Sequence, residues 1–487
     1  MAQKTEGIRF LLNDELQVIG DLDPNTTVLN YLRLVAHKTG TKEGCAEGDC
    51  GACSVVLGEL DGNRIRYRAV NACILFVPTL DGKQLITVED LQGPDGRLHP
   101  VQQAMVDYHG SQCGFCTPGF VMSMFALYKS QPSPSRQEIN DCLAGNLCRC
   151  TGYRPIVEAA EKMYKRRKAD HFAAAERATV RRLKAIQRTD TLAFESGGRK
   201  YFAPVTADGL AKVLQQHPKA CIVAGGTDIG LLVTKDHRDF DVLVHTGGVR
   251  ELAQVVVGDG VIDIGAAAPY SDAIEAIAAD YADFGEVLRR LGSVQIRNAG
   301  TMAGNIGNAS PIGDSPPLLI ALDARVVLRK AAKRRTMALD EFFTGYRKTR
   351  LQRGEFIERI LLPRPRPGLA FGAYKISKRF DQDISGVCGA FALQRDGGRV
   401  GDIRICFGGM AATPKRAVAC EHALRDRDWS LTTVYAGMAA LEADYQPLTD
   451  MRASSDYRLK VAKNLLYKFY LETTGGAAET RVVGYGT

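Results

Sequence analysis

Several features are missing from the 487-residue sequence, and each absence excludes a class of protein. No apolar run reaches the ~20 residues that a helix needs to cross a bilayer. The opening MAQKTEGIRF has no apolar core of a secretion signal. The sequence therefore predicts a cytoplasmic protein with no membrane partner. The histidines occur singly along the chain, so none is predicted to be catalytic.

The sequence also lacks the signatures of a nucleic-acid-binding protein. The formal net charge is +8, but much of the excess lies in Lys165–Lys184, where Phe172 is the single aromatic residue. Single-strand binders interleave basic and aromatic residues, and no nucleic-acid fold motif accompanies this segment. A solvated linker or helix explains the charge, and a basic nucleic-acid binder stays as a minor alternative.

Cysteine is plentiful, and it is concentrated in one part of the chain. The length suits about three domains of roughly 150 residues each. Of the 13 cysteines, nine precede residue 151. In a reducing compartment such crowding indicates metal ligation rather than disulfides. The other four are scattered, and we interpret them as small core residues.

The first cysteine set lies in EGCAEGDCGACS, residues 43–54. Cys45, Cys50 and Cys53 form a C-x4-C-x2-C array, and Cys73 follows as a distant fourth ligand. This is the plant-type pattern for a [2Fe-2S] cluster. A structural zinc site is the alternative, but zinc sites prefer paired C-x2–4-C spacing. The pattern therefore favours iron and sulfur.

The residues around this set predict a small sheet packed on one helix, the layout of a plant-type ferredoxin. Asn13-Asp14 reads as a hairpin turn, and Pro24, Asn25 and Thr26 precede a helix with Val28, Leu29, Leu32 and Val35 on one face. The expected strands are Ile8–Leu12, Leu16–Ile19, Ser54–Leu57, Arg64–Val70 and Leu85–Val88.

A helical pattern follows, with a second cysteine set at its turns. Expected helices are Pro100–Tyr108, Thr117–Tyr128, one opened by the capping box Ser135-x-x-Glu138 and one opened by Pro155. Cys113, Cys116, Cys148 and Cys150 form a C-x2-C and a C-x-C pair. Zinc sites rarely use C-x-C, so we predict a second [2Fe-2S] cluster, whose negative charge Arg149 would offset. Cys142 is interpreted as a core residue.

The motifs QCGFCTPGF and GNLCRCTGYRPI around the second set resemble the iron–sulfur part of the molybdenum hydroxylases, the xanthine dehydrogenase and aldehyde oxidase family. The resemblance covers all eight predicted ligands. It implies that the helical-domain cluster lies nearer the molybdenum and that the ferredoxin-like cluster lies nearer the flavin.

After a basic, Ala-rich segment a new fold is expected to start near Tyr201. Thr206 caps a helix, and a buried strand then runs into a glycine turn. A strand, a glycine turn and a helix place free N–H groups where a pyrophosphate could bind, although tight glycine turns are common. The candidate residues are Cys221, Ile222, Val223, Ala224, Gly225, Gly226, Thr227 and Asp228.

The segment RNAGTMAGNIGNASPIGD, Arg297–Asp314, is predicted to be a donor-rich loop suited to a large polar cofactor, with a surface turn as the alternative. Both segments resemble the flavin domain of the same family. That resemblance implies FAD, with its pyrophosphate on Thr301, Met302, Ala303, Gly304 and Asn305, its ribose near Asp314, and a contact from Lys375 in AYKISKR. Because no His or Cys in these motifs stands at an evident attachment point, the FAD is expected to be non-covalent. Leu291 and Ile357 fall at apolar flavin-contact positions by spacing.

The C-terminal part is expected to alternate strands with helices. Strands are predicted over Gly386–Leu393 and Asp402–Phe407, and helices over Thr432–Tyr445 and Tyr457–Leu471. FGGMAATPKRA resembles the domain that follows the flavin domain in the family. The predicted fold is α+β and multidomain: a β-grasp plant-type ferredoxin domain (1–90), a four-helix [2Fe-2S] bundle domain (91–164), a basic linker (165–198), an α+β FAD-binding domain (199–366) and an α+β C-terminal domain (367–487).

The resemblance implies an electron-transfer subunit with no catalytic residues for hydroxylation, of the two-subunit bacterial type that oxidises hypoxanthine and xanthine. The sequence has no room for a molybdopterin-binding portion, so the expected partner is a molybdopterin-binding large subunit in a dimer of heterodimers. Electrons would pass through two clusters to FAD and then to NAD+, whose access a family loop at residues 380–384 would govern. Alternatives are a related hydroxylase of aldehydes, N-heterocycles or thioesters, a stand-alone NADH-oxidising protein, and a zinc-binding scaffold.

Overall fold

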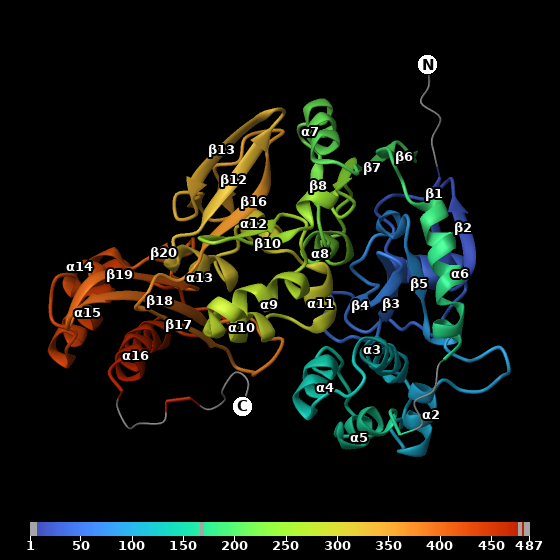
Figure 1. Cartoon of the computed structure of the whole chain (residues 1–487), viewed down its shortest axis with the longest axis horizontal. Helices are drawn as coiled ribbons and strands as arrows, with labels where there is room; N and C mark the ends of the chain where they lie inside the picture. Colours follow the sequence, from blue (N-terminus) through green and yellow to red (C-terminus); the bar gives the residue numbers. More distant parts are fainter. Residues whose placement is uncertain (1–6, 166–169, 476–479, 482–487) are drawn as a thin grey trace. The chain divides into compact units, whose positions relative to one another are not determined.

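The computed structural model describes residues 7–165, 170–475 and 480–481. The chain forms two compact units, Met1–Arg250 with Gly292–Gly300 and Glu251–Leu291 with Thr301–Thr487. Figure 1 draws the chain from blue at its N-terminus to red at its C-terminus. Within the described residues, every helix is too short or too polar to cross a bilayer.

The first unit begins with a five-stranded mixed sheet of β-grasp type, in the order β2-β1-β5-β3-β4. The predicted hairpin is confirmed, with Leu12 opposite Glu15 and Asn13 at a positive φ in the turn. The predicted helix begins with Thr27 as its N-cap, as a short α1 (Val28–Asn30) that continues into a π-helical turn over Tyr31–Val35. The strands are β1 (Ile8–Leu12), β2 (Glu15–Ile19), β3 (Ser54–Asp61), β4 (Arg64–Asn71) and β5 (Gln84–Ile86).

Four helices follow, as predicted: α2 (Pro100–Asp107), α3 (Thr117–Ser130), α4 (Arg136–Leu143) and α5 (Arg154–Lys162). The capping box is confirmed, because the Ser135 hydroxyl accepts the Glu138 N–H at 3.2 Å and the Glu138 carboxylate accepts the Ser135 N–H at 2.6 Å. Phe120 and Phe125 of α3 are fully buried in the core of this bundle. Cys142 is buried in the same core, as expected.

The segment expected to be a basic linker contains regular structure. Helix α6 (His171–Ile186) buries Val180, Leu183 and Ile186 against Leu11 and Ile65 of the β-grasp sheet. Its basic residues Arg181, Arg182 and Lys184 point away from that buried face. The sequence therefore contains an amphipathic helix where charge and alanine content indicated a linker.

A second sheet in the first unit has the order β6-β7-β9-β8. Its elements are β6 (Leu192–Ser196), β7 (Arg199–Ala203), β8 (Cys221–Val223), β9 (Val242–His245), α7 (Ala207–Gln216), α8 (Ile229–Thr234) and α11 (Val294–Ala299). Thr206 caps α7 as predicted, since its hydroxyl accepts the Gly209 N–H at 3.0 Å. Tyr201 and Leu243 share one apolar core with Phe10 of β1 and with Phe76, which lies between β4 and β5.

The second unit begins with an antiparallel sheet in the order β10-β11-β16-β12-β13. Its strands are β10 (Val255–Val257), β11 (Val261–Gly265), β12 (Arg325–Lys330), β13 (Lys333–Ala338) and β16 (Phe356–Pro363), with a small hairpin of β14 (Phe343–Gly345) and β15 (Lys348–Thr349). Four helices accompany it: α9 (Tyr270–Asp280), α10 (Ala282–Arg289), α12 (Met302–Asn308) and α13 (Ser315–Ala321). Residues that were expected to form one flavin domain are thus divided between the two units.

The C-terminal strands and helices are confirmed. An antiparallel sheet contains β17 (Leu369–Ile376), β18 (Val387–Asp396), β19 (Arg399–Gly408) and β20 (Lys415–Arg416), followed by α14 (Val418–Leu424), α15 (Leu431–Asp444) and α16 (Ser455–Thr473). Phe469 of α16 stacks on Phe391 of β18 with ring centroids 5.2 Å apart, which holds the helix on the sheet.

The prediction of a loop over Arg297–Asp314 is wrong for most of its length. The segment contains the end of α11 and all of α12, which ends at Ala309 in the left-handed conformation. Thr301 caps α12, because its hydroxyl accepts the Gly304 N–H at 2.9 Å. Met302, Ala303 and Ile306 are buried at helical spacing. This apolar stripe outweighs the low helix propensity of the glycines.

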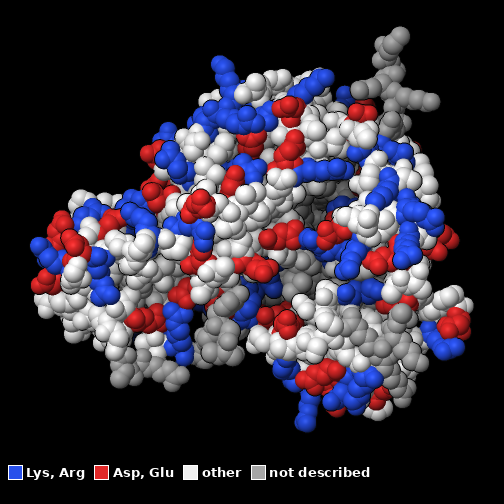
Figure 2. Space-filling view, in the orientation of Figure 1, with Lys and Arg blue, Asp and Glu red and all other residues white. Residues whose placement is uncertain are grey.

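Charge is mixed rather than segregated on the surface that Figure 2 draws. Basic and acidic side chains alternate across this face. On α6, Lys184 donates a hydrogen bond to Asn63 at 2.6 Å, so at least part of the basic segment has protein partners.

Candidate cofactor sites

The first cysteine set is brought together by the loop that precedes β3. The thiols of Cys50 and Cys73 contact that of Cys45, and Cys73 also contacts Cys53. The N–H groups of Glu47 and Cys50 donate to the Cys45 sulfur at 3.4 and 3.3 Å. Hydrogen bonds from Cys50 and Cys73 lower the pKa of the Cys45 thiol. Backbone donors to a sulfur stabilise negative charge on it, which is what a thiolate ligand needs.

The second set lies at the turns of the helical bundle. The sulfurs of Cys113 and Cys150 are 3.5 Å apart, and Cys116 contacts Cys148. Burial raises the pKa of the Cys116 thiol to about 12. Burial also raises the pKa of Cys148, but hydrogen bonds from Thr151 outweigh it and lower that pKa to about 7. The eight predicted ligands thus form two separate groups of four.

The contacts within the second group fit a two-iron centre. Sulfurs meet as Cys113 with Cys150 and Cys116 with Cys148, so each pair could serve one iron. Within the described ranges, no three His, Cys, Asp or Glu side chains surround one metal position.

The first cysteine loop is in contact with two other segments of the first unit. On one side, the carbonyl of Cys50 accepts the N–H of Leu147, next to Cys148, at 2.9 Å. On the other side, Lys235 donates to the Cys45 carbonyl at 2.5 Å and Thr234 donates to the Ala46 carbonyl at 2.7 Å. The order in space is therefore second set, first set, and the β8–α8 segment.

The glycine turn after β8 has close protein neighbours. A Cβ atom built at Gly225 would lie 1.8 Å from the Ala299 carbonyl oxygen, and one at Gly226 would lie 3.0 Å from that of Ile74. Gly226 also has φ of +71°. The sequence interpretation assigned these glycines to a cofactor. Whether or not a cofactor binds there, Gly225 and Gly226 must be glycines, because α11 and Ile74, the residue after Cys73, pack directly against them.

Helix α12, in the second unit, presents a face without side chains. Gly304 and Gly307 are exposed, and a Cβ built at Gly304 would meet only the Thr301 hydroxyl, at 3.1 Å. A Cβ at Gly307 would meet only Ile357, at 3.8 Å. This surface fits a flat group that approaches the backbone closely. Leu291 and Ile357 pack in the apolar cluster of the same unit. The predicted flavin positions Thr301–Asn305, Leu291 and Ile357 therefore all lie in the second unit.

Lys375 and Asp314 contact each other directly. The Lys375 ammonium donates to Asp314 at 2.6 Å and to the Ser385 hydroxyl at 2.9 Å, and Ser385 donates to Asp314 at 2.5 Å. All three residues are buried. An ammonium has three N–H donors, so these two bonds leave one for a further acceptor such as a cofactor oxygen. Ser385 was not predicted, and no sequence motif marks it.

The segment after Lys375 is tied to the end of α10. Arg290 donates to the carbonyls of Phe380 and Lys375 at 3.0 and 3.2 Å, and its guanidinium lies 4.3 Å from the centroid of the Phe380 ring. A cation over an aromatic face is attracted to it. Arg290 therefore positions the loop that was expected to govern nicotinamide access.

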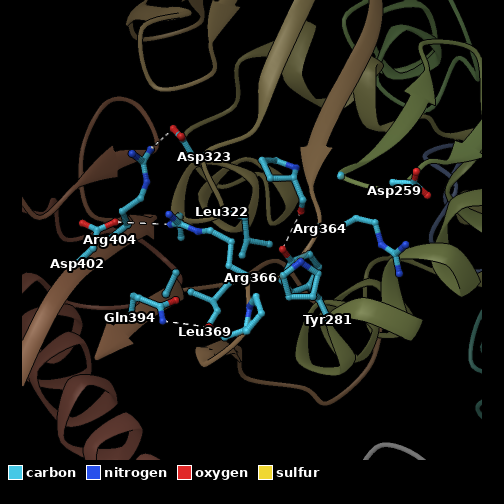
Figure 3. Close-up of a pocket in the computed structure, with 16 residues that line it drawn as sticks. Asp259, Tyr281, Leu322, Asp323, Arg364, Arg366, Leu369, Gln394, Asp402 and Arg404 are labelled. Atoms are coloured by element: carbon cyan, nitrogen blue, oxygen red, sulfur yellow. Dashed lines mark hydrogen bonds and ion pairs between the residues drawn. The ribbon is translucent and has the colours of Figure 1, made fainter. Parts of the chain in front are cut away.

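A cavity of about 490 Å³ lies elsewhere in the second unit. Figure 3 shows Arg404 directed toward Asp323 and Arg366 directed toward Asp402. Arg364 makes two bonds to Asp280, at 2.7 and 3.0 Å, and Arg404 lies 3.1 Å from Asp323. Because these positive charges are already offset, the cavity is not a ready anion site.

Four family models match consecutive regions: "2Fe-2S iron-sulfur cluster binding domain" over 12–78, "[2Fe-2S] binding domain" over 87–161, "FAD binding domain in molybdopterin dehydrogenase" over 192–365, and "CO dehydrogenase flavoprotein C-terminal domain" over 372–473.

Curated relatives and solved structures agree with these matches. The chain is 32% identical to the xanthine dehydrogenase of Emericella nidulans and to the xanthine dehydrogenase/oxidase of Mus musculus, over 95% of its length in each case. It spans 38% of the length of each of these relatives. A carbon monoxide dehydrogenase chain from Hydrogenophaga pseudoflava matches with a TM-score of 0.52 and 28% identity, covering 55% of this chain and 93% of that one. A quinoline 2-oxidoreductase chain from Pseudomonas putida 86 matches with a TM-score of 0.52 and 25% identity, covering 56% and 96%.

Proposed function

We propose that this chain, which belongs to the molybdenum hydroxylase family, passes electrons from purine hydroxylation to NAD+ as the iron–sulfur and flavin part of a xanthine dehydrogenase. The molybdenum centre that oxidises the purine would be carried by a molybdopterin-binding partner. The free thiols suit a reducing compartment such as the cytoplasm.

The cysteines would hold the two clusters. Cys45, Cys50, Cys53 and Cys73 bind one, and Cys113, Cys116, Cys148 and Cys150 bind the other. Bound clusters and flavin supply one-electron transfer and the conversion of single electrons into a hydride for NAD+. The protein fixes the sulfurs and donates backbone N–H groups to them, as at Cys45, which tunes the charge that each site tolerates.

The spatial order of the segments carries the proposal. The Cys50 carbonyl contacts the second set through Leu147, and the Cys45 carbonyl contacts the β8–α8 segment through Lys235. The β8–α8 segment belongs to the region that matches a flavin-binding family. This order supports a route from the helical-domain site through the ferredoxin-like site toward the flavin.

We propose residues 221–228, Leu291, Thr301–Asn305, Asp314, Ile357 and Lys375 for flavin binding. The exposed glycine face of α12 supports its assignment. The remaining donor of Lys375 supports a polar contact to the cofactor.

The substrate separates this proposal from its nearest alternative. The similarity to a quinoline 2-oxidoreductase favours an N-heterocycle hydroxylase as the second candidate. The electron route in this chain would be the same for both. The difference would lie in the molybdopterin-binding partner.

The purified chain should oxidise NADH with an artificial electron acceptor, because the flavin accepts hydride and releases single electrons. It should not hydroxylate hypoxanthine or xanthine alone, and addition of a molybdopterin-binding partner should restore purine oxidation. The measurement is the rate of NADH oxidation and of urate formation, with and without the partner. Purine turnover by the chain alone, or a bound flavin that NADH fails to reduce, would contradict the proposal.

A further inference from the structure

The two cysteine sets are joined by one main-chain hydrogen bond. The Leu147 N–H donates to the Cys50 carbonyl at 2.9 Å, and Leu147 directly precedes Cys148. A continuous path of covalent bonds and this single hydrogen bond therefore connects a predicted ligand of the first set to one of the second. Cys148 is buried, which keeps water away from that end of the path.

Glycines permit this close approach. A Cβ built at Gly51 would lie 2.1 Å from the Gly145 carbonyl oxygen, and one at Gly119 would lie 2.2 Å from that of Gly51. Each distance is far below a van der Waals contact, so any side chain here would push the two loops apart. The loops of the two sets are thus packed backbone against backbone.

A third segment, α11, contributes Gln295 to this junction. Gln295 is 1% exposed, and the two N–H donors of its amide are shared among three acceptors, the hydroxyls of Ser54 and Ser123 and the Asn146 side-chain oxygen, at 3.2, 3.0 and 3.1 Å. Asn146 in turn donates to the Gly51 carbonyl at 3.1 Å. One amide therefore connects β3, α3 and the loop before Cys148.

The other half of the amide is not satisfied. Among the described residues, the Gln295 carbonyl oxygen has no hydrogen-bond donor. It lies against Gly145, where a Cβ would come within 2.1 Å of it. An unpaired buried acceptor destabilises the folded chain, because it loses its hydrogen bonds to water. An apolar side chain of the same size would avoid that cost, but it would remove the hydrogen bonds from the amide to Ser54, Ser123 and Asn146.

We propose that Gln295 is a positioning residue for electron transfer between the two clusters. It fixes Asn146 and Ser54, and through them the Gly51 loop, so that the bond between Leu147 and Cys50 stays formed. In the step that it serves, one electron leaves the reduced cluster of one set and reduces the oxidised cluster of the other, with no bond broken and no proton moved. This inference rests on the proposed function.

The test is Gln295→Met, which keeps the volume and removes the hydrogen bonds from the amide to Ser54, Ser123 and Asn146. When two paramagnetic clusters lie in loops that touch, their magnetic interaction splits the lines of both in the low-temperature EPR spectrum of the reduced chain. We expect iron content and both signals to persist, the splitting to decrease, and electron redistribution after rapid partial reduction to slow about tenfold. Freeze-quench EPR measures that rate.

Gln137→Met is the matched control, because Gln137 is exposed on α4 of the same bundle. It should leave splitting and rate unchanged. Ser123→Ala removes one of the three acceptors of Gln295 and should act in the same direction more weakly. Unchanged splitting and rate in Gln295→Met would overturn the inference, and so would loss of iron from either set, which would assign Gln295 to cluster assembly. A wild-type chain with only one cluster signal would instead overturn the proposed function.

Discussion

The variants Cys50→Ser and Cys148→Ser should each lack one of the two distinct paramagnetic signals of the reduced protein. Each should also lose about half of the iron. The two residues belong to separate groups of four thiols, one before β3 and one in the helical bundle. Serine leaves each group with three thiolates, too few for the cluster. EPR spectra and iron content of the two variants measure this effect.

Cys142→Ser is the control for these variants. Cys142 lies in the same bundle, but its thiol donates to the Ser123 carbonyl at 3.3 Å and faces the core. A serine hydroxyl can make the same bond, so both signals should persist. If the change at Cys50 removes both signals, or the change at Cys142 removes one, the assignment of two independent sites is wrong.

Gly304→Arg should lower the flavin content from about one FAD per chain to near zero. Gly304 is exposed, and only the Thr301 hydroxyl lies near the position of its missing Cβ. The arginine therefore has room in the folded chain and would fill the surface proposed for the cofactor. Absorbance and released FAD in the purified variant give the result.

Gly398→Arg is the matched control in the same unit, because the space around Gly398 is open and the residue lies in the β18–β19 turn. It should keep its flavin. Gly226 is a poor choice for this test, since a side chain there would meet the Ile74 carbonyl whether or not a flavin is bound. Full flavin content in Gly304→Arg would refute the placement on α12.

The cysteine spacing predicted which thiols lie together, because each motif brings its own sulfurs close in the chain; that these groups hold clusters stays a prediction. Three ligands in one loop and a C-x2-C with a C-x-C pair leave few alternatives, and the structure groups the thiols accordingly. The hairpin at Asn13 and the caps at Ser135 and Thr206 were also predictable, because each depends on local hydrogen bonds. Features that depend on contacts between residues close in the chain can therefore be predicted from a single sequence.

Other features depend on contacts that a single sequence does not reveal. Glycine content suggested a loop over 297–314, but Met302 and Ile306 are buried and make part of it a helix. Charge suggested a linker where Leu183 is fully buried in α6. Gln295 follows Ser293, a residue that caps α11, and nothing near it in the sequence points to Ser54 or Asn146. Its partners come from distant segments, so only the fold identifies it.

An anaerobic reductive titration of the purified chain, followed by visible absorbance and EPR, tests the central claim most directly. Two [2Fe-2S] clusters take up one electron each and a flavin takes up two, so the account predicts about four electrons per chain and two separate cluster signals. Uptake of about two electrons with a single signal would contradict it, as would a colourless protein that takes up none.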